Sequence, residues 1–76
     1  MKIIVLGTGC ATCKALFANV QTAVQQLGIE AEVTKQEDIM KIMEYNVMAL
    51  PALVVDDKVV AKGRLLSVEQ VKDLLA

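Results

Sequence analysis

The 76-residue chain contains no histidine and no tryptophan, and its aromatic side chains are limited to Phe17 and Tyr45. Proteins that bind nucleic acids use clustered lysines and arginines together with aromatic side chains that stack on the bases. In this chain the charged residues are scattered, with no basic run, and the formal net charge is -1. The composition therefore argues against nucleic acid as a partner.

Long apolar runs are also missing. No stretch approaches the roughly 20 apolar residues that a membrane-spanning helix needs. The apolar run at residues 3–6 is too short for a secretory signal peptide and is needed as the first strand. We therefore expect a cytoplasmic protein without a membrane partner, folded as a single domain over residues 1–76 around a dense aliphatic core.

The two cysteines, Cys10 and Cys13, lie between a strand-like and a helix-like segment. Lys2–Leu6 is a run of β-branched and aliphatic residues typical of a buried strand. From Ala11 to Leu27 the apolar residues recur at steps of three and four, which predicts a helix. Because the first N–H groups of a helix lack partners and its dipole places positive potential there, a thiolate is stabilised at this point.

This position predicts a reactive thiol at Cys10. An unperturbed thiol has a pKa near 8.5, so only about 3% of it is ionised at pH 7. A helix terminus supplies up to about 2 kcal/mol, which lowers the pKa to about 7 and ionises about half of the thiol. In this geometry Cys10 is the exposed nucleophile, and Cys13, one turn into the helix, is the partner that closes a disulfide.

A structural disulfide is the first alternative for these cysteines. A bridge across two residues closes a very short loop, worth roughly 2 kcal/mol against roughly 4 kcal/mol for a bridge that spans most of the chain. In a cytosolic protein, two cysteines at this spacing are more often redox-active or metal-binding than permanently bridged. A purely structural role is therefore disfavoured.

The first helix and the segment after it predict a βαβ unit. The buried face of the helix is expected to carry Cys13, Leu16, Phe17, Val20, Val24 and Leu27. Gly28 suits the left-handed position that ends a helix. Residues 29–34 then alternate apolar and polar, as in a strand with one buried face. The two strands should be parallel, with a right-handed crossover.

Residues 36–46 predict a second helix. Glu37 and Asp38 fall in its expected first turn, where negative charge is favoured. Its expected apolar stripe consists of Ile39, Ile42 and Met43. Met40, Tyr45 and Met48 lie off this stripe, and the sequence leaves two readings for them, a core rim or a partner-binding surface.

The last third of the chain predicts a β-hairpin and a final helix. Two short strands, 52–55 and 59–61, flank a tight turn, and Pro51 is tolerated at the first strand because its missing N–H lies outside the ladder. Ser67 and Gln70 form a capping-box pattern, with Leu66 placed to pack onto the helix. The expected buried face of this helix is Val68, Val71, Leu74 and Leu75.

The element order β-α-β-α-β-β-α predicts an α/β fold with a four-stranded mixed sheet. All three helices can be buried if the strands are ordered second, first, third, fourth, with helices on both faces. The third strand then runs antiparallel to the first, and its start lies beside the end of the first. Pro51 should therefore lie against Cys10 and Cys13, although about forty residues separate them in the chain.

On these residues the chain resembles the thioredoxin superfamily in its short, glutaredoxin-like form, and most closely the small redox-active disulfide proteins of bacteria and archaea. The resemblance covers the whole chain. Its parts are the motif Cys10-Ala11-Thr12-Cys13 between strand and helix, Lys14 after it, Leu50-Pro51 at the third strand and Gly63 after the fourth.

The resemblance implies a thioredoxin-like fold and a thiol–disulfide oxidoreductase active in cell redox homeostasis. It implies Cys10 as nucleophile and Cys13 as resolving cysteine, with their redox-active disulfide in place of any other cofactor and with no bound metal. Pro51 would be cis and face the disulfide, and Leu50 would pair its backbone with the substrate. The implied partners are a protein disulfide substrate and a disulfide reductase, and we expect a monomer.

The chain also departs from its relatives at the supporting positions. Ala11 and Thr12 replace the Gly-Pro of thioredoxin and the Pro-Tyr of glutaredoxin, and Gly9 stands where thioredoxin has tryptophan. Lys14 alone does not make a glutathione-binding set. The first strand is apolar after Lys2, so the buried carboxylate that assists proton transfer in thioredoxin is absent. Proton transfer at the resolving cysteine must then use water or another group.

Two functions of other classes remain as alternatives. Residues 7–13 superficially resemble the Met-x-Cys-x-x-Cys loop of soft-metal carriers, and two thiolates suit Cu(I) or zinc. Against this, the methionine is missing, the chain ends in a capped helix rather than a strand, and two cysteines without histidine cannot complete a zinc site. The other alternative is a non-catalytic binding module that docks a partner through Tyr45, Met48 and Leu50.

Overall fold

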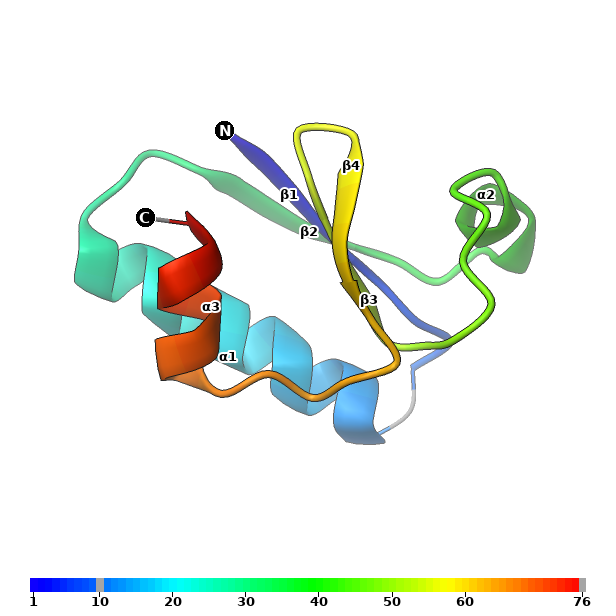
Figure 1. Ribbon diagram of the computed structural model, residues 1–76, viewed down its shortest axis with the longest axis horizontal. Coiled ribbons are helices and arrows are strands. Elements are labelled where there is room, and N and C mark those ends of the chain that lie inside the picture. The colour runs from blue at the N-terminus through cyan, green and yellow to red at the C-terminus, as the bar shows by residue number, and fades with distance from the viewer. Residues whose placement is uncertain (10, 76) are drawn as a thin grey trace.

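The computed structural model describes residues 1–9 and 11–75 of the chain, so Cys10 and Ala76 lie outside the described residues. Within them the elements follow the predicted order (Figure 1). They are β1 (Lys2–Leu6), α1 (Ala11–Leu27), β2 (Glu32–Gln36), α2 (Ile39–Met43), β3 (Ala52–Val55), β4 (Lys58–Lys62) and α3 (Val68–Leu75).

The four strands form a mixed sheet in the order β2-β1-β3-β4, which confirms the predicted topology. β1 and β2 are parallel, and β1 and β3 are antiparallel. In this register Leu6, the last residue of β1, lies between Gln36 on one side and Ala52 on the other. The end of β1, the end of β2 and the start of β3 therefore meet at one edge of the sheet.

Helices cover both faces of the sheet, as predicted (Figure 1). Side chains alternate along β1, so Ile3 and Val5 face α1 and α3 while Leu6 faces α2. The first cluster, under α1 and α3, consists of Ile3, Val5, Leu16, Val20, Ala23, Leu53, Leu66, Val71 and Leu75. The second cluster, under α2, consists of Leu6, Ile42, Val47, Ala52 and Val54.

α1 presents the predicted face to the sheet, with one addition. Phe17, Val24 and Leu27 are half-buried against the first cluster, and Ala23 is fully buried although the periodicity had not included it. Ala23 tolerates this place because a methyl group lets the helix approach the sheet closely. Gly28, at φ +66°, ends the helix as predicted, and its N–H donates to the Val24 carbonyl at 3.1 Å.

β2 begins three residues later than the alternating pattern predicted. The pattern covered residues 29–34, whereas the strand is Glu32–Gln36. β2 begins where its partner strand β1 begins. The first hydrogen bond between them runs from the Glu32 N–H to the Met1 carbonyl, at 2.9 Å. Ile29 and Ala31 still pack against the first cluster, but outside the sheet.

α2 is shorter than predicted, because it begins at Ile39 and ends at Met43. Asp38 is its N-cap, and the carboxylate accepts a hydrogen bond from the Met40 N–H at 3.0 Å. The expectation that Glu37 and Asp38 lie in the first turn is therefore wrong, since both precede the helix. The positive φ of Asn46, +57°, ends the turn that follows the helix.

The predicted apolar stripe of α2 is correct only at Ile42, which is buried in the second cluster. Ile39 and Met43 are exposed, because a helix this short turns only one side chain toward the sheet. Tyr45 packs at the rim of the second cluster. The core-rim reading is wrong for Met40 and Met48, whose side chains are 71% and 97% exposed.

The hairpin and α3 follow their local sequence signals. Asp56 and Asp57 have φ values of +48° and +69°, as in the two-residue turns that favour Asp, Asn and Gly. The Ser67 N–H donates to Gln70 Oε1 at 2.9 Å, and the Gln70 N–H donates to Ser67 Oγ at 3.2 Å, so the capping box is confirmed. Leu74, expected in the buried face, is instead exposed.

Candidate functional site

The candidate site lies at the sheet edge where β1 and β2 end and β3 begins. After Leu6, the segment Gly7-Thr8-Gly9 bends away from the sheet toward α1. Its path depends on Gly9, whose φ of +87° strains any residue with a side chain. The Gly7 N–H still donates to the Gln36 carbonyl at 3.1 Å, which ties the bend to the end of β2. Cys10 follows in the sequence and lies outside the described residues.

Cys13 lies in the first turn of α1 and is only 6% exposed. Its side chain packs against the backbone of Gly7, because a Cβ added to Gly7 would lie 2.8 Å from Cys13 Cβ and closer still to Cys13 Sγ. α1 has no acidic residue in its first turn, so no carboxylate there offsets the positive potential of the helix terminus. Cys13 is thus a buried sulfur at the start of a helix whose positive end is not offset by an acidic residue.

Pro51 directly precedes β3 and is buried. Because Leu6 pairs with Ala52, Pro51 lies at the same end of the sheet as Gly7, against which Cys13 packs. This agrees with the expectation from topology that Pro51 lies near Cys13. The same expectation for Cys10 concerns a residue outside those described. The peptide bond between Leu50 and Pro51 is cis.

The segment around Pro51 is held by Gly63. The Gly63 N–H donates to the Pro51 carbonyl at 2.8 Å. A Cβ on Gly63 would lie 2.9 Å from Ala49 Cβ, so this glycine lets the two segments approach. Leu50 is half-buried and packs against the second cluster.

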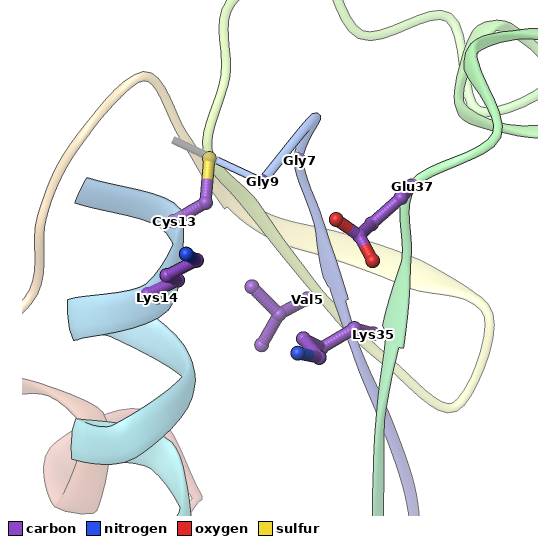
Figure 2. A pocket seen from close by; sticks show the side chains of 7 residues that line it. All are labelled: Val5, Gly7, Gly9, Cys13, Lys14, Lys35 and Glu37. Atoms are coloured by element: carbon purple, nitrogen blue, oxygen red, sulfur yellow. The ribbon is translucent and has the colours of Figure 1, made fainter. Parts of the chain in front are cut away.

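A small pocket opens beside Cys13, with about 20 Å³ accessible to a sphere the size of a water molecule (Figure 2). Its lining consists of Val5, Gly7, Gly9, Cys13, Lys14, Lys35 and Glu37. Gly9 and Lys14 were singled out from the sequence as supporting residues. The other two, Ala11 and Thr12, are exposed in the first turn of α1 and do not line the pocket.

Known proteins resemble this chain over its whole length. A family model described as a thioredoxin domain matches residues 1–76 of the chain. The chain belongs to the thioredoxin superfamily. A thioredoxin from Methanothermobacter thermautotrophicus is 43% identical over 76 residues, covering 100% of this chain and 99% of its own length. A thioredoxin from Methanocaldococcus jannaschii is 41% identical over 71 residues, covering 93% of this chain and 81% of its own.

The fold is also that of a solved thioredoxin. Thioredoxin 1 from the thermophilic eubacterium Thermosipho africanus superposes with a TM-score of 0.67 over 99% of this chain and 90% of its own. At 22% identity this similarity establishes the thioredoxin fold alone. The four-stranded mixed sheet and its helices are therefore the thioredoxin arrangement.

Two charged residues of this thioredoxin-family site, Lys35 and Glu37, were not expected there from the sequence. Sequence periodicity placed Glu37 inside a helix, but β2 runs parallel to β1 and ends beside Gly7. The predicted parallel pairing was the signal that could have located them, because residues at the end of β2 must then lie next to the bend after β1. Lys35 Nζ also lies 5.2 Å from the centre of the Phe17 ring.

Neither a metal cluster nor a membrane span is found in the part of the chain that the structure describes. In residues 1–9 and 11–75, no three His, Cys, Asp or Glu side chains lie close enough together to hold a metal ion. Over the same residues, every helix is too short or too polar to cross a bilayer.

Proposed function

We propose that this protein is a thiol–disulfide oxidoreductase that reduces disulfides in other proteins. The observation that carries the proposal is the burial of Cys13 against Gly7, at the sheet edge where Pro51 directly precedes the third strand. Membership of the thioredoxin superfamily supports thiol–disulfide chemistry in general. Cys10, three residues before Cys13 and next to the start of α1, is the nucleophile in this proposal.

The first step forms a mixed disulfide. The Cys10 thiolate attacks one sulfur of the target disulfide, a new S–S bond forms, and the electron pair of the broken bond leaves on the other target sulfur. That sulfur takes a proton from solvent. The backbone of Leu50, next to Pro51 at the sheet edge, would pair with the extended target segment.

The second step releases the target. The Cys13 thiol loses its proton and attacks Cys10 Sγ, so the Cys10–Cys13 disulfide forms as the bond to the target breaks. The target leaves with both sulfurs reduced. A disulfide reductase then returns the dithiol, and the protein needs no cofactor beyond its own disulfide. We propose that it works as a monomer in the cytoplasm and takes part in redox homeostasis.

The redox equilibrium of the cysteine pair tests this proposal. The metal-free protein would be equilibrated in mixtures of reduced and oxidised dithiothreitol, and its thiols would be trapped by alkylation and counted by mass. We expect a reversible two-electron transition between a dithiol and an intramolecular disulfide. A protein that forms no intramolecular disulfide at any ratio would contradict the proposal.

Two single substitutions separate the roles of the cysteines. We expect Cys10→Ser to abolish the reduction of insulin disulfides, because the nucleophile is lost. We expect Cys13→Ser to accumulate a covalent adduct with insulin, because the first step proceeds and the second cannot. Non-reducing gel electrophoresis would show the adduct, and its appearance with Cys10→Ser instead would reverse the assigned roles.

A further inference from the structure

Glu37 supplies the carboxylate among the described side chains that line the pocket beside Cys13. Figure 2 shows this carboxylate pointing from the end of β2 toward α1, which carries Cys13. A Cβ on Gly9 would lie 2.7 Å from Glu37 Oε2, so the carboxylate lies against the backbone of the bend that follows β1. The pocket therefore lies between Cys13 of α1 and the Glu37 side chain next to the end of β2.

The proposed second step needs a proton acceptor near Cys13. A thiol attacks a disulfide only as the thiolate, so the Cys13 proton must leave before or during the attack. The sulfur is buried, and β1 beneath it carries no acidic residue. Of the residues described around this pocket, Glu37 is the one whose side chain is a carboxylate, a group that can accept a proton.

We propose that Glu37 accepts the Cys13 proton through a water molecule held in this pocket, an inference that rests on the proposed function. The accessible volume of about 20 Å³ fits one water, which needs roughly 10–15 Å³. In the step, the Cys13 S–H bond breaks, water takes the proton and passes one of its own to the carboxylate. At the same time the Cys13–Cys10 bond forms, and the electron pair of the broken mixed disulfide leaves on the target sulfur.

Charged side chains surround the pocket. Lys14 on α1 and Lys35 on β2 line it together with Glu37. The charge of Glu37 opposes a second anion at Cys13, and protonation of the carboxylate removes that repulsion as the thiolate forms. Glu37 is exposed, so it returns the proton to solvent afterwards. Because it acts through water, Glu37 is a positioning residue for the proton.

The test uses 5,5′-dithiobis(2-nitrobenzoate) as the disulfide, mixed in stopped flow with the reduced protein. Attack by Cys10 releases the first coloured thiolate, and attack by Cys13 on the mixed disulfide releases the second, so the two steps give two phases. This leaving group departs as an anion without needing a proton, and the second phase therefore depends on the loss of the Cys13 proton. Cys13→Ser, which stops after one equivalent, identifies the phases.

The variant Glu37→Gln keeps the shape of the side chain and removes the base. We expect its second phase to be slower by at least about tenfold at neutral pH, with no slowing of the first phase. The difference should shrink as the pH rises toward about 10, where a thiol ionises without help. The matched control is Glu32→Gln, an exposed carboxylate at the other end of β2, and it should follow the unmodified protein at every pH.

Three results would overturn the inference. The inference fails if Glu37→Gln leaves the rate of the second phase unchanged. It also fails if Glu37→Gln slows the second phase by the same factor at every pH, because that would indicate a structural role. The third is equal slowing by Glu32→Gln. If the unmodified protein releases only one equivalent, the proposed function itself fails and the inference with it.

Discussion

At the scale of single residues, two glycines leave room at the site for side chains that come from other elements. Gly7 faces Cys13 of α1, and Gly9 faces the carboxylate of Glu37. A Cβ would meet its neighbour at 2.8 Å in the first case, at Cys13 Cβ, and at 2.7 Å in the second, at Glu37 Oε2. The two positions differ in whether the neighbouring atom can move away. Cys13 Cβ is fixed to a helix, whereas the carboxylate ends a flexible side chain.

We therefore predict that Gly7→Ala displaces Cys13. The added methyl overlaps Cys13, and the variant should lose about 1–3 kcal/mol of unfolding free energy, the usual cost of overpacking. Formation of the Cys10–Cys13 disulfide should also slow, because the resolving sulfur is moved. Urea unfolding and timed alkylation would measure the two effects.

Gly28→Ala is the matched control for that substitution. Gly28 has a φ of +66° and no heavy atom within 4 Å of an added Cβ, so only backbone strain applies. We expect a cost of about 1 kcal/mol with no change in the rate of disulfide formation. The explanation given for Gly7 would be wrong if both variants changed that rate equally.

At the scale of elements, the two short helices are held in different ways. α3 begins with a reciprocal capping box and buries Val71 and Leu75 against the first cluster. α2 begins with a single side-chain cap from Asp38 and buries only Ile42. The start of α3 is thus determined by local hydrogen bonds, whereas α2 depends on one packed side chain.

The cap of α3 leads to a prediction about stability alone. Ser67→Ala removes the oxygen that accepts the Gln70 N–H, and should cost about 1 kcal/mol of unfolding free energy. Ser67→Asp restores an acceptor and should recover most of that loss. Because Ser67 bonds to Gln70 and does not line the pocket beside Cys13, the redox midpoint of the cysteine pair should be the same in all three proteins. A shifted midpoint would show coupling that these contacts do not contain.

At the scale of the whole molecule, one sheet separates two clusters of unequal size. In the second cluster α2 contributes Ile42. The same cluster includes Leu6 and Ala52, which flank the candidate site. A chain of 76 residues has a free energy of unfolding of roughly 4–11 kcal/mol in total. Removal of one large side chain from either cluster should therefore cost a large fraction of the free energy of unfolding.

We predict that Ile42→Ala costs about 2–5 kcal/mol, because it empties a fully buried position. Met40→Ala, on the same helix but 71% exposed, should change stability by less than about 0.5 kcal/mol. Chemical denaturation followed by far-ultraviolet circular dichroism would measure both. Equal losses would mean that Met40 is packed rather than exposed.

The candidate site was predictable wherever it depended on neighbours in sequence or on strand order. The placement of Cys13 in the first turn of a helix follows from the apolar periodicity after it. The nearness of Pro51 to that end of the sheet follows from a strand order that buries all three helices, and the structure has this order. Glu37 and Lys35 could not be placed in the same way, because the alternating pattern predicts that β2 begins three residues too early and the predicted second helix is longer than α2.

The sequence by itself determined the order of the elements, the pairing of the strands, the hairpin turn and the cap of α3. The elements, the turn and the cap depend on the period of apolar residues and on hydrogen bonds between residues close in the chain. The strand pairing followed from the crossover between the first two strands and from the need to bury all three helices. Only the tertiary structure decided where β2 begins, how long α2 is and which side chains surround Cys13. The ladder to β1, the cap at Asp38 and the contact of Glu37 with Gly9 decide these points. The ladder to β1 and the contact of Glu37 with Gly9 join residues more than twenty positions apart. The cap at Asp38 competed with a longer helix that periodicity alone favoured.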